Sequence, residues 1–232
     1  MPELYKLQWD NVGEHLYETG VNHAVLFPYN KTTSSYGAGV AWNGITGVTE
    51  SPSGAEATAL YADNIKYLNL RSTEEFGATV TAYTYPDEFA VLDGSAEIAT
   101  GVKIGQQNRG TFALAYRTEL GNDTEGNDYG YKIHLIYGAT ATPSEKAYST
   151  INDSPSAIEF SWTLNTTPVS VAGFKPTASV VIDSTKCDET KLAAFLQILY
   201  GTPASGSTAA IEPRIPLPDE VATLLATTNP QG

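Results

Sequence analysis

Three acidic residues lie close together in the loop 121-GNDTEGNDYG-130, where they could form a calcium-binding site. They are Asp123, Glu125 and Asp128. The spacing differs from that of an EF-hand, because the invariant glycine is misplaced and no bidentate glutamate follows at position 12. A solvated hairpin tip between two strands is therefore the favoured interpretation, and a calcium site is the alternative.

The histidines and the single cysteine give weaker signals for chemistry. His15, His23 and His134 have no partner at i+3 or i+4 that would suit zinc. His134 lies within an expected strand, and we predict a surface or interface position for it. Cys187 stands at the start of an expected helix, where a thiol pKa can fall, but no base is positioned beside it. We therefore expect no catalytic residue, no metal site and no cofactor.

Composition indicates an acidic chain built mostly of β-structure. The 232 residues include 26 Asp and Glu against 13 Lys and Arg, which gives a net charge of −13. The basic residues are scattered, whereas binding to a phosphate backbone needs a basic patch. The 14 tyrosines, with frequent threonine and valine, suit the pleated surface of a sheet. No stretch approaches the ~20 apolar residues that span a membrane.

Alternation of apolar and polar residues predicts the strands. The clearest case is 158-IEFSWTLNT-166, in which every second side chain is apolar, as in a strand with one buried face. The same period occurs over 112–120 and 131–137. Residues 178–183 alternate less cleanly, which is typical of a strand buried on both faces. Shorter runs add three expected strands, over 23–29, 37–42 and 77–85.

Two segments have the patterns of helices. Residues 185–201 place a stripe of apolar residues at helical spacing, namely Leu192, Phe195, Leu196 and Leu199. Thr185 and Asp188 resemble a capping box, and Gly201 suits the position after the last turn. A shorter helix is expected over 86–94, which starts with a proline and ends with a glycine.

The chain divides by composition at Gly201. Residues 1–201 are expected to form one mostly β domain, in which residues 1–22 are an N-terminal arm. Residues 202–232 are rich in proline, alanine and threonine, and we interpret them as an extension with a short amphipathic turn at 219–225.

The segment 56-EATALYADNIKYLNL-70, followed by 74-EEFGATVTAYTYPDEF-89, carries a family resemblance. It is similar to the signature segment of the major tail proteins (tail tube proteins) of long-tailed, non-contractile bacteriophages that infect Gram-positive hosts. Four further stretches resemble the same family in the same order: 7–29, 101–139, 145–169 and 174–186. The resemblance covers residues 1–201, and the extension after Gly201 departs from it.

This resemblance implies a structural virion protein and no enzyme activity or cofactor. Such proteins close into hexameric rings that stack into a hollow tail tube, through which DNA passes without specific binding. The implied fold is mainly β (α+β): a tail-tube-like β-sandwich or partly open barrel of two packed antiparallel sheets, with one flanking helix and extended arms. The implied partners are other copies of the chain, a tape-measure protein in the lumen, and the tail terminator and tail-tip (distal tail) proteins. The implied location is the virion tail, assembled in the host bacterial cytoplasm, with no membrane involved.

Residues 43–70 and the N-terminal arm are the expected contacts between subunits or rings. Tyr61–Asn64 has the pattern of a tight turn between short strands, and the small residues before it permit close backbone approach. The candidate contact residues are Trp42, Leu60, Tyr61, Asp63, Asn64 and Tyr67. In the alternative interpretation, Leu60, Tyr61 and Tyr67 are core residues.

Acids on the polar strand faces are candidates for the lumen of such a tube, because an acidic or neutral lining would not retain phosphates. Glu119 and Glu159 are the two candidates, and either residue could equally face the outer solvent.

Two other function classes stay open. An aromatic-rich β-sandwich would suit a carbohydrate-binding module, and a glycoside hydrolase would need a carboxylate pair that the sequence does not single out.

Overall fold

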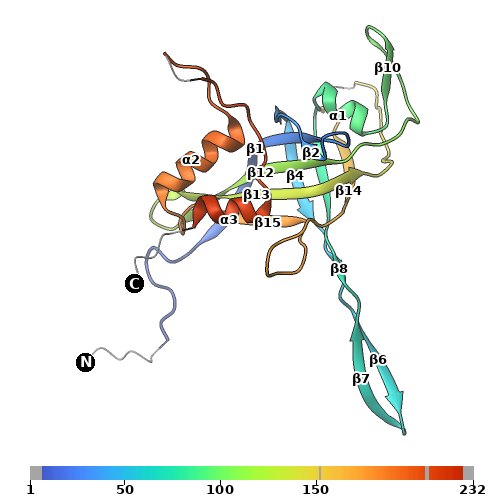
Figure 1. Cartoon of the computed structure of the whole chain (residues 1–232). Helices are drawn as coiled ribbons and strands as arrows, with labels where there is room; N and C mark the ends of the chain where they lie inside the picture. Colours follow the sequence, from blue (N-terminus) through green and yellow to red (C-terminus); the bar gives the residue numbers. More distant parts are fainter. Residues whose placement is uncertain (1–6, 152, 207–208, 227–232) are drawn as a thin grey trace.

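The computed structural model describes residues 7–151, 153–206 and 209–226, and it is mainly β with antiparallel pairing throughout (Figure 1). The main sheet has the order β2-β1-β12-β13-β14-β9-β4, with β15 added on β13 and β3 on β1. Its strands are β1 (Tyr17–Asn30), β2 (Ser35–Tyr36), β3 (Val40–Ala41), β4 (Ile45–Glu50), β9 (Gly77–Ala82), β12 (Phe112–Asn122), β13 (Gly126–Ala141), β14 (Phe160–Thr166) and β15 (Ser179–Asp183). The expected mainly β, sandwich-like fold is thus confirmed.

Small hairpins and helices complete the described structure. The hairpins are β5 (Ser53–Gly54) with β8 (Glu74–Glu75), β6 (Ala57–Ala62) with β7 (Ile65–Arg71), and β10 (Ala96–Ala99) with β11 (Val102–Ile104). The helices are α1 (Asp87–Leu92), α2 (Glu189–Tyr200) and α3 (Pro218–Leu225). In Figure 1, α2 and α3 lie against the strands β13 and β15, and the β6–β7 hairpin extends far from the body.

The long strand β13 divides the main sheet into two layers. Its residues 132–136 pair with β15, whereas Ala139–Ala141 pair with β14. The change of partner occurs at Gly138, which has a φ of +60°, and a Cβ at this position would lie 2.1 Å from the carbonyl oxygen of Thr167. Glycine is therefore required at this bend. One layer contains β1, β12, β13 and β15, and the other contains β14, β9 and β4.

The inner core lies between the two layers and is rich in aromatic rings. Trp162 is fully buried at its centre, and its ring centroid lies 5.1 Å from that of Phe89 and 5.6 Å from that of Trp42. Such edge-to-face contacts add to the free energy gained from burial. Helix α1 contributes Phe89 and Leu92 to this core, so that it closes one end of the sandwich.

An outer core lies between the first layer and the helices α2 and α3. Ala113 and Ala115 of β12 are fully buried there, on the same face of the strand as Arg117 and Glu119, which the alternation over 112–120 placed opposite the apolar face. The predicted division of β12 into two faces is confirmed, but the alternation did not predict that the second face is also covered, by Leu192, Phe195 and Leu199 of helix α2. The opposite error applies to 178–183, expected to be buried on both faces: Val181 is 49% exposed.

Helix α2 begins later than the expected helix over 185–201. Asp188 is its N-cap and accepts a hydrogen bond from the Lys191 amide at 3.0 Å. Thr185 instead donates to Asp183 in the preceding turn, at 2.6 Å. Gly201 ends the helix with a φ of +76°, at the position that its sequence context indicated.

The segments at the two ends of the chain are tied into the body. Strand β1 already begins at Tyr17, inside the expected N-terminal arm. Beyond Gly201, Ile215 and Val221 are buried in the outer core, and the Tyr137 hydroxyl donates to the Pro216 carbonyl at 2.7 Å. Residues 1–6 of the expected arm, and 207–208 and 227–232 of the expected extension, lie outside the described residues.

Substitution of two phenylalanines, one buried and one exposed, tests the packing of the outer core. Phe195 is fully buried under α2, whereas Phe174 is 81% exposed. We expect Phe195→Ala to lower the free energy of unfolding by about 3–5 kcal/mol, because it removes a fully buried ring and leaves a cavity. Phe174→Ala should change it by less than about 0.5 kcal/mol. Urea denaturation of both variants measures the difference, and equal effects would contradict the packing described.

Candidate functional site: an exposed hairpin arm

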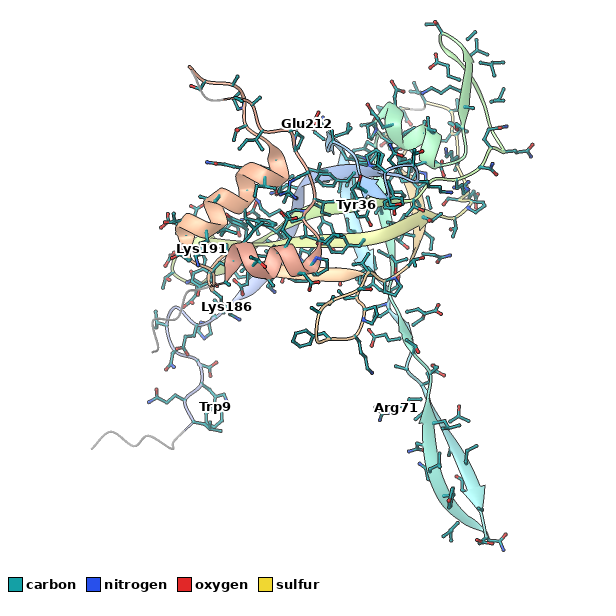
Figure 2. All side chains as sticks on the ribbon, viewed as in Figure 1. Trp9, Tyr36, Arg71, Lys186, Lys191 and Glu212 are labelled. Atoms are coloured by element: carbon teal, nitrogen blue, oxygen red, sulfur yellow. The ribbon has the colours of Figure 1, made fainter. Side chains whose placement is uncertain are left out.

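A hairpin arm, residues 51–76, is the most exposed ordered part of the described chain. It continues the adjacent strands β4 and β9 outward, first as the short β5–β8 pair and then as β6–β7. Every residue of β7 is exposed, and in β6 only Ala59 is half-buried. Figure 2 shows Arg71 on the arm, well away from the labelled residues of the body.

The tip of the arm is a two-residue turn at Asp63 and Asn64. Both residues have positive φ values, of 51° and 62°, and the flanking Ala62 and Ile65 form the last pair of the ladder. Two consecutive positive φ values define a type I′ turn, which matches the twist of the strands that it joins. Aspartate and asparagine tolerate this backbone conformation better than most residues. The tight turn expected from the sequence is confirmed.

The register of β6 and β7 separates the arm into an apolar and a polar face. Opposed residues of an antiparallel pair share a face, and neighbours along a strand alternate. Leu60 therefore shares a face with Leu68, and the adjacent pair of Ala59 and Asn69 points the other way. The apolar face continues to both ends of the hairpin, through Thr58, Ala62, Ile65 and Leu70. The register shift after Leu60 leaves Tyr67 without a paired residue.

This apolar face of the arm is open to solvent in the described chain. Ile65 is 65% exposed, Leu70 56%, Leu60 41% and Leu68 38%. Soluble monomers rarely leave a contiguous apolar surface without a partner. The face therefore has the properties of a contact surface rather than of a folded core.

The structure separates the residues that the sequence grouped as contact candidates. Five of them belong to the arm: Leu60, Tyr61, Asp63, Asn64 and Tyr67. Tyr61 and Tyr67 are 72% and 68% exposed, so the alternative that they are core residues is wrong. Trp42 does not belong with them. It is 3% exposed in the inner core, and its Nε1 donates to the Thr84 carbonyl at 2.9 Å.

The two acids proposed for a lumen also differ in position. Glu119 lies on the α2 side of β12, where it accepts hydrogen bonds from Asn22 and, at 2.9 Å, from Arg117. Burial by itself would raise the pKa of Glu119, but these two partners outweigh it and lower the pKa. Glu159 is exposed beside the start of β14, and Thr46 donates a hydrogen bond to it.

His134 was predicted at the surface or in an interface, and the structure contradicts the surface position. Its side chain is 11% exposed, and its ring stacks on Tyr116 with a centroid distance of 4.6 Å and an interplanar angle of 4°. The Tyr116 hydroxyl donates to Glu50 at 2.8 Å, which links β12 to β4. Burial and this carboxylate raise the pKa of Tyr116. The cluster therefore joins the two layers at one end of the sandwich.

The loop 121–130 is a hairpin tip, as favoured above, and it holds the N-terminal segment. The Asp123 carboxylate accepts hydrogen bonds from the Gly13 amide, at 3.0 Å, and from the His15 amide, at 3.3 Å. The bond from Gly13 is the main reason why the pKa of Asp123 is lowered. The segment beyond this anchor exposes large apolar residues, among them Leu7, Trp9 and Val12.

The described residues give little support for a metal site or a reactive cysteine. No group of three or more His, Cys, Asp or Glu side chains among them could hold a metal ion. Burial raises the pKa of the half-buried Cys187 thiol, which disfavours the reactive thiolate. No helix within the described ranges has the length and apolarity to cross a membrane.

The anchor of the N-terminal segment gives a prediction. Asp123→Asn should weaken the hydrogen bonds from Gly13 and His15, because a neutral amide oxygen accepts less strongly than a carboxylate. We expect several-fold faster hydrogen exchange of both amides. In the native chain the same loosening should occur as the pH falls below about 4, where a carboxylate with a lowered pKa takes up its proton.

The matched control for this prediction is Asp128→Asn, in an exposed residue of the same loop. It should leave both amides unchanged, as followed by NMR or mass spectrometry. Equal exchange in the two variants would show that Asp123 does not hold the segment.

A scan against protein-family models and a search of curated proteins found no match for this chain. The function proposed for it therefore depends on the resemblance given above and on the geometry of the arm.

Proposed function

We propose that this chain is the structural subunit of a hollow, non-contractile phage tail tube, in which its copies close into hexameric rings that stack. The observation that carries the proposal is the exposed apolar face of the arm, formed by Leu60, Ile65, Leu68 and Leu70. These residues lie in the stretch that resembles the signature segment of the tail tube family. The role is structural and not enzymatic.

Burial of this apolar face would provide the free energy for assembly. Full burial of a leucine or isoleucine side chain contributes about 1.5–3 kcal/mol relative to full exposure. The four side chains are 38–65% exposed, so each has about 1 kcal/mol left to gain. An isolated two-stranded hairpin is also marginal in water. Contact with a neighbour would thus stabilise both the assembly and the arm.

A second copy of the chain is the occupant that fits the arm best. The outer part of the arm, the β6–β7 hairpin 57–71, has a net charge of +1, from Lys66 and Arg71 against Asp63, in a chain of net charge −13. Glu56, Glu74 and Glu75 at its base give the whole arm a net charge of −2. The weakly basic β6–β7 hairpin is complementary to the acidic body of another copy. Arm and body are different surfaces, so their contact is heterologous, and such contacts generate closed rings or open filaments.

The remaining parts of the proposal follow from the resemblance. The tube would enclose a tape-measure protein and later pass DNA without specific binding, which agrees with the scattered basic residues. The tail terminator and tail-tip proteins would bind its two ends. The site of action would be the virion tail, after assembly in the host cytoplasm.

The carbohydrate-binding alternative receives less support from the positions of the aromatic residues. Trp42 and Trp162 are buried in the inner core, as are Phe89 and Phe112. Apart from Tyr61 and Tyr67, which share the arm, the exposed aromatic residues are spread over separate segments, namely Trp9, Tyr17, Tyr83, Tyr148 and Phe174. A sugar-binding platform needs several such rings on one surface.

The direct test is electron microscopy of the purified chain, alone and mixed with tail-tip proteins, with light scattering on the same samples. Hollow tubes or six-fold rings are expected. A chain that stays monomeric with tail-tip proteins present would contradict the proposal.

Two adjacent residue pairs on the arm provide a matched test. Leu60→Ser with Leu68→Ser alters one cross-strand pair on the apolar face. Ala59→Ser with Asn69→Ser alters the neighbouring pair, which faces the other way. We expect the first variant to remain a folded monomer by circular dichroism and to lose tube formation, because the contact loses apolar area. The second should form tubes normally. Equal assembly of both variants would exclude the apolar face as the contact.

A further inference from the structure

The outer face of the second layer carries rows of hydroxyl side chains. Thr49 of β4, Thr79 of β9 and Thr163 of β14 are directly opposed across the three strands. The next row contains Gly47, Thr81 and Ser161, and Thr46 reaches into it by donating to the Thr81 hydroxyl at 2.8 Å. Asn165 extends the face beyond the first row.

The alternate rows of the same strands point into the inner core. Val48, Val80 and Trp162 form one such row, and Val80 and Trp162 are fully buried. The hydroxyl residues therefore occupy the opposite face, where Thr49, Thr163 and Asn165 are exposed. In contrast, helices α2 and α3 cover the outer face of the first layer. Of the two outer faces, this one is the open sheet surface in the described chain.

The hydroxyl face carries no basic residue on its three strands. Its outward residues are Thr46, Gly47, Thr49, Gly77, Thr79, Thr81, Ser161, Thr163 and Asn165. Glu159 lies just before β14 and is the acid that contacts this group, through Thr46. A chain with 26 acidic and 13 basic residues thus presents an almost uncharged polar sheet.

We propose that this hydroxyl face of β4, β9 and β14 lines the lumen of the tube. The inference rests on the proposed function and identifies the surface that meets the transported polyanion. Duplex DNA carries about one charge per 1.7 Å, and each lysine or arginine on a surrounding wall would retain a phosphate. Hydroxyl groups keep the wall hydrated without binding phosphates ionically. They also avoid the repulsion that a dense ring of carboxylates would impose.

The two acids considered for the lumen, Glu159 and Glu119, lie on different sides of the molecule. Glu159 lies at the edge of the hydroxyl face, whereas Glu119 lies on the α2 side and is paired with Arg117. Glu159 is therefore the lumen acid. The arm prolongs β4 and β9, so the strands that form the wall also carry the contact surface to another copy.

Accessibility of single cysteines in assembled tubes tests the assignment. In a Cys187→Ser background, Thr163→Cys places a thiol on the hydroxyl face, and Lys186→Cys places one beside α2, where the lysine side chain is 81% exposed. Each variant is treated with a small maleimide and with a maleimide coupled to a dextran too large to enter a tube. If Thr163→Cys does not fold, Asn165→Cys replaces it.

In the free chain, both cysteines should react with both reagents. In tubes, we expect the dextran reagent to label Thr163→Cys at least tenfold less than Lys186→Cys, whereas the small reagent labels both. Equal labelling by the dextran reagent would place the hydroxyl face outside and overturn the inference, although the tubes themselves would still support the proposed function. Protection of Thr163→Cys from both reagents would show a subunit contact and would also overturn it. Failure to form tubes at all would overturn the proposed function and the lumen assignment with it.

Discussion

The architecture depends on one long strand, β13, which pairs with β12 along one edge and changes its partner along the other. Strand β13 pairs with β15 along residues 132–136 and with β14 at its end, and Gly138 provides the bend between them. Because of this division, the inner core lies between two layers and the outer core lies under α2 and α3. One layer is thus covered by helices, and the other keeps an open, hydroxyl-rich face.

The arm follows from the same arrangement. Strands β4 and β9 are adjacent in the open layer, and the chain between them leaves the body as a hairpin that no other described element covers. The register of β6 and β7 places leucine and isoleucine side chains on one face of the arm. That face is exposed because no other described element covers it. A folded body with an uncovered apolar arm is suited to assembly, and under the proposed function another copy would supply the missing packing.

The sequence predicted those features that depend on local periodicity and turn chemistry. The alternation over 158–166 identified β14, and the Asp63–Asn64 turn was recognised from its residue types. The features that the sequence did not predict depend on tertiary packing. Trp42 and His134 gave no local signal of burial, because the residues that cover them come from distant segments such as Phe89 and Tyr116. The covering of the second face of β12 by α2 was missed for the same reason.

The most direct test of the assembly account is an electron cryo-microscopy reconstruction of the tube at a resolution that shows side chains. The account predicts that Leu60, Ile65, Leu68 and Leu70 pack against a neighbouring copy and that Thr49, Thr79 and Thr163 face the lumen. A reconstruction in which the apolar face of the arm contacts only solvent would contradict the account at its central point.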